Sequence, residues 1–353
     1  MKFVRTKNLE PGMISTKSIQ DSSGVLMLAA NHPITADIIQ AMKRKGMAGV
    51  FIFDEFTQFE QFDSIVNDEF RQEAVNALRD FNIDKVIYLT NMIVEKIMST
   101  KELVVDLHEL SIYDQDTYDH SMNVCTLATT CGVGMGLDTD NLQQLALAAM
   151  LHDVGKRNIP LAILNKQGKL TPAEREIINE HPQMGYDLLY ANQSISSYVR
   201  AAILSHHENY DGTGYPNHLA GEAIPLFARI IHIADVYDAL TRKRSYKDKY
   251  MQSESLEFLM GNCGSMFDPD IVNTFLKYIV VYPVGCDVIL SDGRIAHVIK
   301  NRSSSVTRPV VMTWDKEKLD LAKDPACRHI TVIKELDFDG SSSEEMTEHE
   351  KAR

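Results

Sequence analysis

Cysteine is scarce in this sequence, and it contains no long hydrophobic run. The 353 residues include five cysteines, an odd number at scattered positions that form no CxxC pair. This usage is typical of reduced, mostly buried thiols in a cytoplasmic protein. No apolar run approaches the roughly 18 residues that a membrane-spanning helix needs, so we expect no membrane span. Met1 to Thr6 precede a polar stretch and a Pro-Gly turn, a pattern unlike a signal peptide.

Basic residues are few relative to acidic ones. The chain has 36 lysines and arginines against 49 aspartates and glutamates, which gives a net charge of −13. Binding to a nucleic-acid polymer requires a cationic surface that neutralises phosphates, so this function class is excluded, although a local cationic pocket is not. Hydrophobic residues make up 44% of the sequence, enough for a sizeable core in two or three domains.

Residues 1–56 combine short β-like runs with one helical pattern. Phe3-Val4, Val25–Leu28 and Val50–Phe53 have the composition of strands, and Thr35–Lys45 carries apolar residues at helical spacing. We predict a small α+β domain here. Two interpretations of it remain open, an accessory or sensory role and a plain scaffold.

Two polar segments are less informative. Residues 57–105 carry apolar residues at helical spacing and predict a helical linker, which could also supply a pair of helices for a homodimer. Apolar faces of this length are more often intramolecular core than partner surface. Residues 336–353 contain no apolar run, and we expect a disordered acidic tail.

Residues 281–335 predict a small β subdomain. Val288–Leu290 and Ile295–Ile299 flank a Ser-Asp-Gly turn, which is the pattern of a β-hairpin. Pro309–Trp314 and His329–Ile333 are further candidate strands. No residue combination in this subdomain predicts chemistry.

Residues with metal-binding chemistry stand at the ends of apolar helical runs in the middle of the chain. The run Leu142–Leu151 ends in His152-Asp153, and Lys156 follows one turn later. A buried histidine and carboxylate are costly unless they are paired or ligated. Imidazole and carboxylate bind divalent transition metals, and a nearby ammonium binds a substrate phosphate. A structural hydrogen bond within the pair at a helix C-terminus is the alternative.

A second doublet, His206-His207, follows the apolar residues Val199–Ile203. Adjacent helical residues point about 100° apart, so one metal cannot readily bind both, whereas two neighbouring metals can. The same logic lets Asp153 bridge two ions while His152 binds one. Metal pairs about 3.5–4 Å apart are a known device for phosphoester hydrolysis, so the two doublets predict a multinuclear site.

Two further histidines are candidate ligands. His181 precedes a proline at a junction, after a helix start with Thr171 as N-cap and Glu174 three residues later. His120 lies four residues after Asp116, so on a helix both side chains share one face and can address one ion. Taken alone, His181 could simply end a helix, and the other two residues could form a surface pair.

The remaining signals are an acid, a loop and a cationic cluster. Asp235 interrupts an apolar helical run, where a carboxylate is unfavourable unless it meets a cation. Asp211–Pro216 is a glycine-rich loop in which Gly214 permits close approach of a ligand and Tyr215 can stack on a base. Arg242–Lys247 suits an anionic substrate. A plain turn and an interaction with a helix dipole are the respective alternatives for loop and cluster.

Together these segments resemble the HD-GYP family, a branch of the HD-domain metal-dependent phosphohydrolases. The resemblance covers roughly residues 106–280, and its motifs, in family order, are His152-Asp153 with Lys156, His181-Pro182, His206-His207-Glu208, Gly214-Tyr215-Pro216 and Asp235. It implies a mainly α fold, an HD-domain helical bundle between the small N-terminal α+β domain and the small C-terminal β subdomain. It also implies two or three divalent metal ions, usually iron or manganese, and hydrolysis of cyclic di-GMP through linear pGpG towards GMP.

The resemblance assigns site residues one by one. The implied metal ligands are His120, His152, Asp153, His181, His206, His207 and Asp235. The implied catalytic and substrate-binding residues are Asp153, Lys156, Gly214, Tyr215, Arg244 and Lys247. Members with a third metal have a glutamate where this chain has Asp116, the candidate ligand for a third ion. The family's Arg-Pro-Tyr is Arg244-Ser245-Tyr246 here, a change that loosens the substrate loop and keeps its charges.

The implied reaction, in bacterial second-messenger signalling, is attack on phosphorus by a hydroxide that bridges two metals. Asp153 would bridge the ions, and Lys156 would add positive charge at the phosphate. One alternative is a degenerate module that binds a cyclic dinucleotide, or a signalling partner protein, with little turnover. Another is a phosphodiesterase for a different cyclic dinucleotide, such as cyclic GMP-AMP. Retention of every ligand argues against the degenerate module, because unused buried charges are destabilising.

Overall fold

The computed structural model of the chain describes most of residues 2–336. The described residues are 2–20, 25–47, 49–54, 56–59, 68–100, 103, 105, 117–166, 168–241, 252–302 and 305–336. They fall into two compact units. The helical unit comprises Ser64–Val105 and Tyr113–Ile279, and the terminal unit comprises Met1–Asp63, Asp106–Ile112 and Val280–Arg353.

The domain ranges 1–56, 57–105, 106–280 and 281–335 remain a prediction. By compactness, the helices before residue 105 group with those that follow residue 113, and the two ends of the chain group with one another. The predicted tail lies, from residue 337 onwards, outside the described residues.

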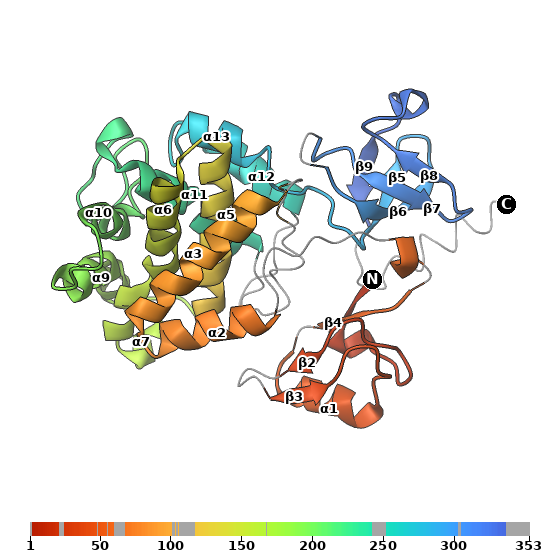
Figure 1. Cartoon of the computed structure of the whole chain (residues 1–353), viewed down its shortest axis with the longest axis horizontal. Coiled ribbons are helices and arrows are strands. Elements are labelled where there is room, and N and C mark those ends of the chain that lie inside the picture. Colours follow the sequence, from red (N-terminus) through yellow and green to blue (C-terminus); the bar gives the residue numbers. More distant parts are fainter. Residues whose placement is uncertain are drawn as a thin grey trace. The chain divides into compact units, whose positions relative to one another are not determined.

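The helical unit is built from α-helices and short 3₁₀ turns (Figure 1). Its α-helices are α2 (Asp68–Arg79), α3 (Ile83–Ser99), α5 (Thr117–Gly134), α6 (Thr139–Leu151), α7 (Leu161–Leu164), α8 (Pro172–Asn179), α9 (His181–Tyr190), α10 (Ser197–Ser205), α11 (Leu226–Thr241), α12 (Gln252–Gly261) and α13 (Pro269–Phe275). Its 3₁₀ turns are η3 (Val154–Asn158) and η4 (Gly221–Ala223). The predicted mainly α class, a helical bundle with smaller α+β and β parts, is confirmed.

Three helices form the centre of the helical unit. α5 packs against α6 and α11, while α3 and α10 flank α6 (Figure 1). Every residue from Leu145 to Leu151 in α6 is buried, so the last two turns of this helix are apolar on all sides, as a central helix requires. Burial of this end of α6 also buries His152, the residue that caps it.

Side-chain caps set where the helices around the site begin. Asp138 accepts a hydrogen bond from the Asn141 N–H at the start of α6. Thr171 and Glu174 form the predicted capping box at the start of α8. The chain then pauses and resumes as α9 at His181, which is the predicted junction. His181 therefore stands where α8 has ended and α9 begins.

The first part of the terminal unit contains two β-ribbons and one helix. Its elements are β1 (Lys2–Arg5), η1 (Thr6–Asn8), β2 (Ile19–Gln20), β3 (Leu26–Leu28), α1 (Ala36–Arg44), β4 (Gly49–Ile52) and η2 (Thr57–Phe59). β1 pairs antiparallel with β4, and β2 pairs antiparallel with β3. α1 begins at the Thr35 cap and buries Ile39 and Met42 against these strands. The α+β composition predicted for this segment is confirmed.

The second part of the terminal unit is a five-stranded antiparallel sheet in the order β8-β7-β6-β5-β9. Its elements are β5 (Asp287–Leu290), β6 (Ile295–Lys300), β7 (Val310–Thr313), β8 (Lys318–Asp320), η5 (Pro325–Cys327) and β9 (Val332–Glu335). The predicted hairpin is β5 with β6. The last strand, β9, begins at Val332 and not at His329 as expected. Ile330 lies in the segment before β9, and its side chain is buried in the core of the sheet.

Phe56 joins the two parts of the terminal unit. Its ring stacks on the His297 ring of β6 at 4.6 Å between centroids and packs with Ile299, Val310 and Met312. The C-terminal sheet therefore forms one hydrophobic cluster with a residue from the N-terminal segment.

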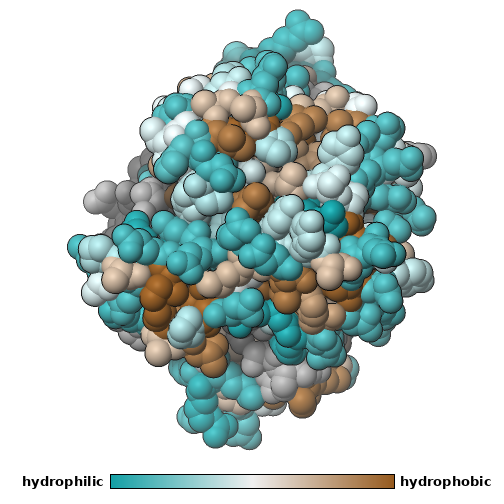
Figure 2. Space-filling model, turned by 90° about the vertical axis from the view of Figure 1, so that its left-hand side faces the viewer, coloured by the Kyte–Doolittle hydropathy of each residue, from teal (hydrophilic) through white to brown (hydrophobic). Residues whose placement is uncertain are grey.

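The face of the helical unit over α9 and α10 is mostly hydrophilic, with hydrophobic residues scattered between polar ones (Figure 2). Among the described helices, none has the length and apolar character needed to cross a bilayer. All five cysteines are free and four are buried, as predicted. Burial raises the pKa of the Cys125 and Cys131 thiols to about 12.

Candidate metal centre

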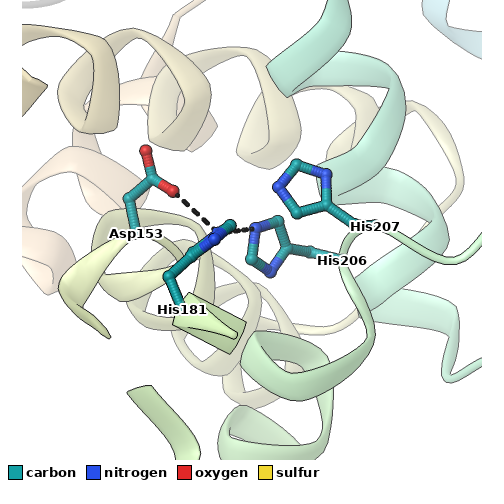
Figure 3. A group of neighbouring side chains, drawn as sticks. All are labelled: Asp153, His181, His206 and His207. Atoms are coloured by element: carbon teal, nitrogen blue, oxygen red, sulfur yellow. Dashed lines mark hydrogen bonds and ion pairs between the residues drawn. The ribbon is translucent and has the colours of Figure 1, made fainter. Parts of the chain in front are cut away.

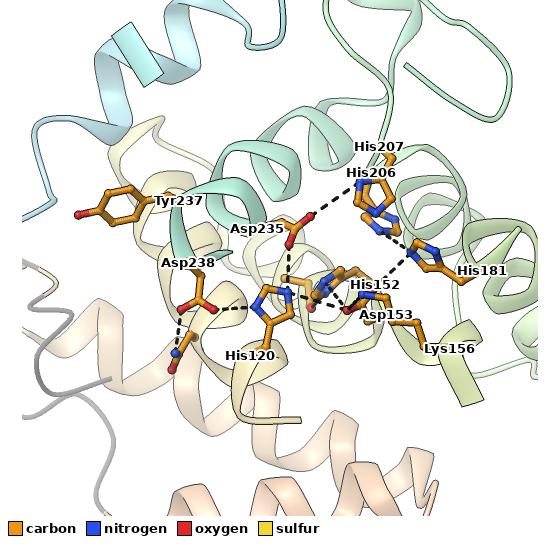
Figure 4. A network of polar contacts seen from close by, with 12 residues as sticks. His120, His152, Asp153, Lys156, His181, His206, His207, Asp235, Tyr237 and Asp238 are labelled. Atoms are coloured by element: carbon orange, nitrogen blue, oxygen red, sulfur yellow. Dashed lines mark hydrogen bonds and ion pairs between the residues drawn. The ribbon is translucent and has the colours of Figure 1, made fainter. Parts of the chain in front are cut away.

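Seven side chains of the helical unit converge into two adjacent groups (Figures 3 and 4). The first group is Asp153, His181, His206 and His207, and the second is His120, His152 and Asp235. Within each group, one ligand atom from every residue lies within 4.8 Å of the others. The structure thus brings together all seven residues that the sequence singled out as ligands, from α5, α9, α11 and the segments that directly follow α6 and α10.

Three of the histidines make the same hydrogen bond to the end of a helix. His152 Nδ1 donates to the Ala149 carbonyl, and His206 Nδ1 donates to the Ile203 carbonyl, each over 2.7 Å. His181 Nδ1 repeats the contact at 2.7 Å with the carbonyl three residues before it. In each case one of the last carbonyls of a helix accepts the ring proton.

These hydrogen bonds orient the three rings so that they can bind a metal. A proton fixed at Nδ1 leaves the lone pair at Nε2, which faces the centre. The helices that end here also direct the negative ends of their dipoles towards it, and this favours a bound cation. His181 Nε2 and His206 Nε2 lie 3.3 Å apart, as two donors to one ion would (Figure 3).

Asp153 lies between the two groups (Figure 4). Its Oδ1 is 3.3 Å from His181 Nε2, in the first group. Its Oδ2 is 3.5 Å from His152 Nε2 and 3.9 Å from His120 Nε2, in the second group. One carboxylate can therefore address an ion in each group.

Asp235 spans the groups as well. Its Oδ1 is 3.0 Å from His120 Nε2, and its Oδ2 is 3.9 Å from His207 Nδ1. The sequence predicted a bridging position for Asp153 alone. Two carboxylates with oxygens in both groups are a stronger indication of a paired metal site than either doublet.

The protonation states suit metal ligands. Burial, reinforced by neighbouring imidazoles, lowers the pKa of His206 well below its ordinary value. Burial also lowers the pKa of His207, although Asp235 opposes it. Burial alone would raise the pKa of Asp153, but Lys156 and His152 outweigh it and hold the pKa well below its usual range. Neutral imidazoles and ionised carboxylates are the forms that bind metals.

His120 differs from the other histidines. Burial lowers its pKa, but hydrogen bonds from its ring to Asp235 and Asp238 outweigh this and raise the pKa to about 9. The ring therefore lies between two carboxylates that attract positive charge. A cation held beside Asp235 would take the place of the proton at His120 Nε2.

The donor set fits a divalent transition metal. His152 Nε2 is buried and has no hydrogen-bond partner among the described residues. A buried polar atom without a partner is costly, and a cation at the centre would supply one. Imidazole nitrogens suit metals such as iron and zinc, and carboxylate oxygens suit manganese and magnesium. The two groups are therefore compatible with divalent metal binding.

A buried network orients His120 from behind (Figure 4). His120 Nδ1 donates to Asp238 Oδ2 over 2.6 Å, and Asn123 Nδ2 donates to Asp238 Oδ1 over 2.8 Å. Arg71 of α2 donates from Nη1 to Asn123 Oδ1 over 3.1 Å. None of these three partners was predicted to have a role. The available signal was spacing, because Asp238 follows Asp235, and Asn123 follows His120, by three residues on a helix.

Replacing Asp238 with asparagine is expected to weaken metal binding by about 10–100-fold, the range found when a hydrogen-bond partner behind a ligating histidine is lost. Asparagine keeps the shape of the side chain but removes the charge that holds the His120 ring. Competition with a chromophoric chelator measures the affinity. Asp138→Asn, the same change at the α6 N-cap, is the control, because asparagine caps a helix as well as aspartate. Equal affinities of both variants would exclude the orienting role.

Lys156 and Tyr215 both border the centre. Lys156 Nζ lies 2.6 Å from Asp153 Oδ2, and a quarter of its side chain is exposed. The Tyr215 ring stacks on the His207 ring, with centroids 4.9 Å apart. Both side chains are therefore adjacent to the ligands, and their predicted contacts with a substrate remain predictions.

The glycine-rich loop is held against the second histidine doublet. A Cβ on Gly214 would lie 2.2–2.5 Å from backbone atoms of residues 207–209, so the loop itself requires glycine there. Glu208 is buried and accepts hydrogen bonds from the N–H groups of Asn217 and Leu219. Glu208 was part of the motif without an assigned role, and it anchors the loop. Contact of Gly214 with a substrate stays a prediction.

Three predicted residues lie outside the described residues. These are Asp116, the candidate ligand for a third ion, and Arg244 and Lys247 of the substrate loop. His232, which shares a helix with Asp235, donates from Nε2 to Asn209 Oδ1 over 3.1 Å and belongs to neither ligand group.

Comparison with known proteins agrees with this geometry. A family model described as HD domain matches residues 97–271. A cyclic di-GMP phosphodiesterase of Pseudomonas aeruginosa is 37% identical over 226 residues, which cover 64% of this chain and 54% of that protein. A cyclic di-GMP phosphodiesterase response regulator of Xanthomonas campestris is 45% identical over 144 residues, 40% of this chain and 38% of the relative.

A third relative carries a different substrate in its name. A 3'3'-cGAMP-specific phosphodiesterase of Vibrio cholerae is 34% identical over 224 residues, which cover 61% of this chain and 43% of that protein. The chain spans about half the length of these relatives or less. The matched segment contains both ligand groups and the Gly-Tyr-Pro loop at 214–216. These matches support assignment of residues 97–271 to the HD-GYP branch of the HD-domain family.

Proposed function

We propose that this chain is a metal-dependent phosphodiesterase that hydrolyses cyclic di-GMP, through linear pGpG towards GMP, in bacterial second-messenger signalling. One observation carries the proposal. Asp153 and Asp235 each have one oxygen towards either ligand group, which supports a single site in which the seven side chains would hold two adjacent cations. A pair of ions is suited to the displacement of one phosphoester oxygen by another.

The proposed cofactors are two divalent ions, with iron or manganese as the preferred metals. Five imidazoles and two carboxylates form a mixed nitrogen and oxygen donor set, which both metals accept. Such an ion pair polarises phosphoryl oxygens and lowers the pKa of a bound water. A third ion at Asp116 is a further part of this proposal.

The chain's own residues would hold and orient the substrate. Lys156 lies beside Asp153 and is partly exposed, so its ammonium can approach a phosphate held at the centre. Tyr215 packs beside His207, where its ring can meet the sugar or base of the bound nucleotide. Arg244 and Lys247 would add positive charge. Asp153 and Asp235 keep the two ligand groups in one geometry.

Cyclic di-GMP is the preferred substrate because several of the similar proteins bear it in their names. The second candidate is 3'3'-cGAMP, because two similar proteins of Vibrio cholerae are named for it. A module that binds without turnover is disfavoured. Without metal ions, the buried His152 Nε2 would have no hydrogen-bond partner. The two carboxylates that reach both ligand groups would then have no cation to bind.

The test is incubation of the full chain, loaded with Fe²⁺ under reducing conditions or with Mn²⁺, with cyclic di-GMP and with 3'3'-cGAMP separately. Chromatography should show pGpG or GMP from cyclic di-GMP, and none after chelation of the metal. Faster turnover of 3'3'-cGAMP would favour the second candidate. Recovery of both dinucleotides intact from metal-loaded protein would reject the phosphodiesterase proposal.

A further inference from the structure

A cavity of about 470 Å³ opens beside the metal centre of the helical unit. Asp153 and Lys156 line it on the side of the centre, and Leu78 and Arg79 line it from the last turn of α2. Its volume falls in the range of roughly 300–1,000 Å³ that is typical of small-molecule sites. A molecule that reacts at the metal centre can therefore extend into this cavity.

The cavity favours an anionic ligand with an apolar part. Its described lining includes three cations, Arg79, Lys156 and Arg157, and one carboxylate, Asp153, which is already paired with Lys156. In a chain with a net charge of −13, this excess of positive charge is local. Aliphatic side chains such as Leu161 supply apolar surface in the same cavity. A nucleotide combines these two requirements in one molecule.

Arg157 fixes α2 as a wall of this cavity. Its Nη1 donates to the carbonyls of Arg79 and Leu78 over 2.9 and 3.3 Å, and these are among the last carbonyls of α2. Carbonyls at the C-terminus of a helix attract a cation. The guanidinium also lies 5.1 Å from the centroid of the Phe81 ring. Arg157 follows Lys156 directly, so the end of α2 is tied to the turn that carries Asp153.

Arg79 and Tyr118 lie together at the α2 wall. The Arg79 guanidinium lies over the Tyr118 ring, 5.9 Å from its centroid, and both side chains line the cavity. Arg79 is exposed to solvent, so a ligand can reach it. A guanidinium beside an aromatic ring can bind a phosphate and a neighbouring base at once, because the guanidinium donates in a plane and the ring offers a face.

We propose that the α2 wall is a substrate subsite. Arg79 binds the second phosphate of a cyclic purine dinucleotide whose first phosphate lies at the metal centre and Lys156. Tyr118 packs against the adjoining purine. This proposal rests on the proposed function and adds a residue from outside the family match, since α2 ends before residue 97, where that match begins.

Arg79→Gln separates this subsite from the metal centre. With metal-loaded full chain, KM for cyclic di-GMP should rise about 10–100-fold, as loss of one charge-assisted hydrogen bond produces, while kcat stays near that of the unaltered chain. Bis(p-nitrophenyl) phosphate has one phosphate and no base, so its hydrolysis should not change. Arg79→Lys, which keeps the charge without the planar fork, should recover part of the loss.

Calorimetric titration of the metal-loaded protein with a non-hydrolysable phosphorothioate analogue of cyclic di-GMP provides a second readout that does not depend on turnover. Arg79→Gln should weaken this binding, and Lys85→Gln should not. Lys85 is a matched control because its ammonium also lies beside a ring, 5.2 Å from the Tyr88 centroid, and it is not among the residues that line the cavity.

The outcomes separate the subsite from the proposed function. Unchanged KM and unchanged binding in Arg79→Gln, with normal hydrolysis by the unaltered chain, would overturn the subsite alone. Weaker binding in Arg79→Gln, without hydrolysis by the unaltered chain, would support the subsite and reject the phosphodiesterase. Absence of both binding and hydrolysis in the unaltered chain would overturn both proposals.

Discussion

Replacement of Asp153 with alanine is expected to abolish phosphodiester hydrolysis. Its two oxygens face His181 in one ligand group and His120 and His152 in the other, so its loss removes a donor from both ions. Loss of the paired site removes several kcal/mol of stabilisation of the transition state, which corresponds to a fall in kcat/KM on the order of 10³-fold or more. The measurement is turnover together with metal content by mass spectrometry.

Asp187→Ala is the matched control for this change. Asp187 is an exposed aspartate of α9 that accepts a hydrogen bond from Gln183 and belongs to neither ligand group. It should keep both metal content and activity. Near-normal metal content and turnover in Asp153→Ala would rule out the bridging role.

Gly155→Ala is expected to separate the Asp153 turn from α9. A Cβ on Gly155 would lie 2.0 Å from the His181 carbonyl oxygen and 2.6 Å from the Gly185 nitrogen. Both contacts are with backbone, so α9 must move and carry His181 away from Asp153. Overpacking of this kind costs about 1–3 kcal/mol of unfolding free energy. We expect a lower unfolding midpoint in denaturant for the metal-free protein, and loss of metal from the loaded protein.

Gly261→Ala is the control, because a Cβ at this exposed position of α12 meets nothing within 4 Å. It should be neutral, or stabilising by up to about 1 kcal/mol, since alanine has the higher helix propensity. If Gly155→Ala matched this control in stability and in metal content, the close packing of η3 on α9 would not be what positions His181.

Much of the fold could be predicted because its signals are local. The apolar run that becomes α6, and the Thr171–Glu174 capping box, lie within single helices. The same holds for the β5–β6 hairpin, whose turn and strands are adjacent in sequence. Grouping of the two chain ends could not be predicted, because it depends on contacts such as Phe56 with His297 between distant segments.

The candidate site, too, could be predicted from local signals only in part. Convergence of the seven candidate ligands was expected from the two doublets at the ends of apolar helices together with the resemblance to the HD-GYP family. The Asp238–Asn123 hydrogen bond joins residues 115 positions apart, and the Arg71–Asn123 bond joins residues 52 apart. No local pattern reports such contacts. Nor does a local pattern show that Asp235 has an oxygen in each group.

The α2 wall of the cavity also depends on contacts between distant segments, so it could not be predicted from the sequence. Residues 57–105 were predicted as a linker because their apolar spacing indicates only that helices form. The contacts of Arg157 with the end of α2 depend on the packing of η3, which no property of α2 itself encodes. A substrate subsite built from a connecting helix can therefore be recognised only in three dimensions.

The most direct test of the paired metal site is an anomalous difference map from crystals of the manganese-loaded chain. The account predicts two peaks about 3.5–4 Å apart. One should lie among His181, His206 and His207 and the other between His120 and His152, with Asp153 reaching both. A single peak, or peaks remote from these side chains, would contradict it.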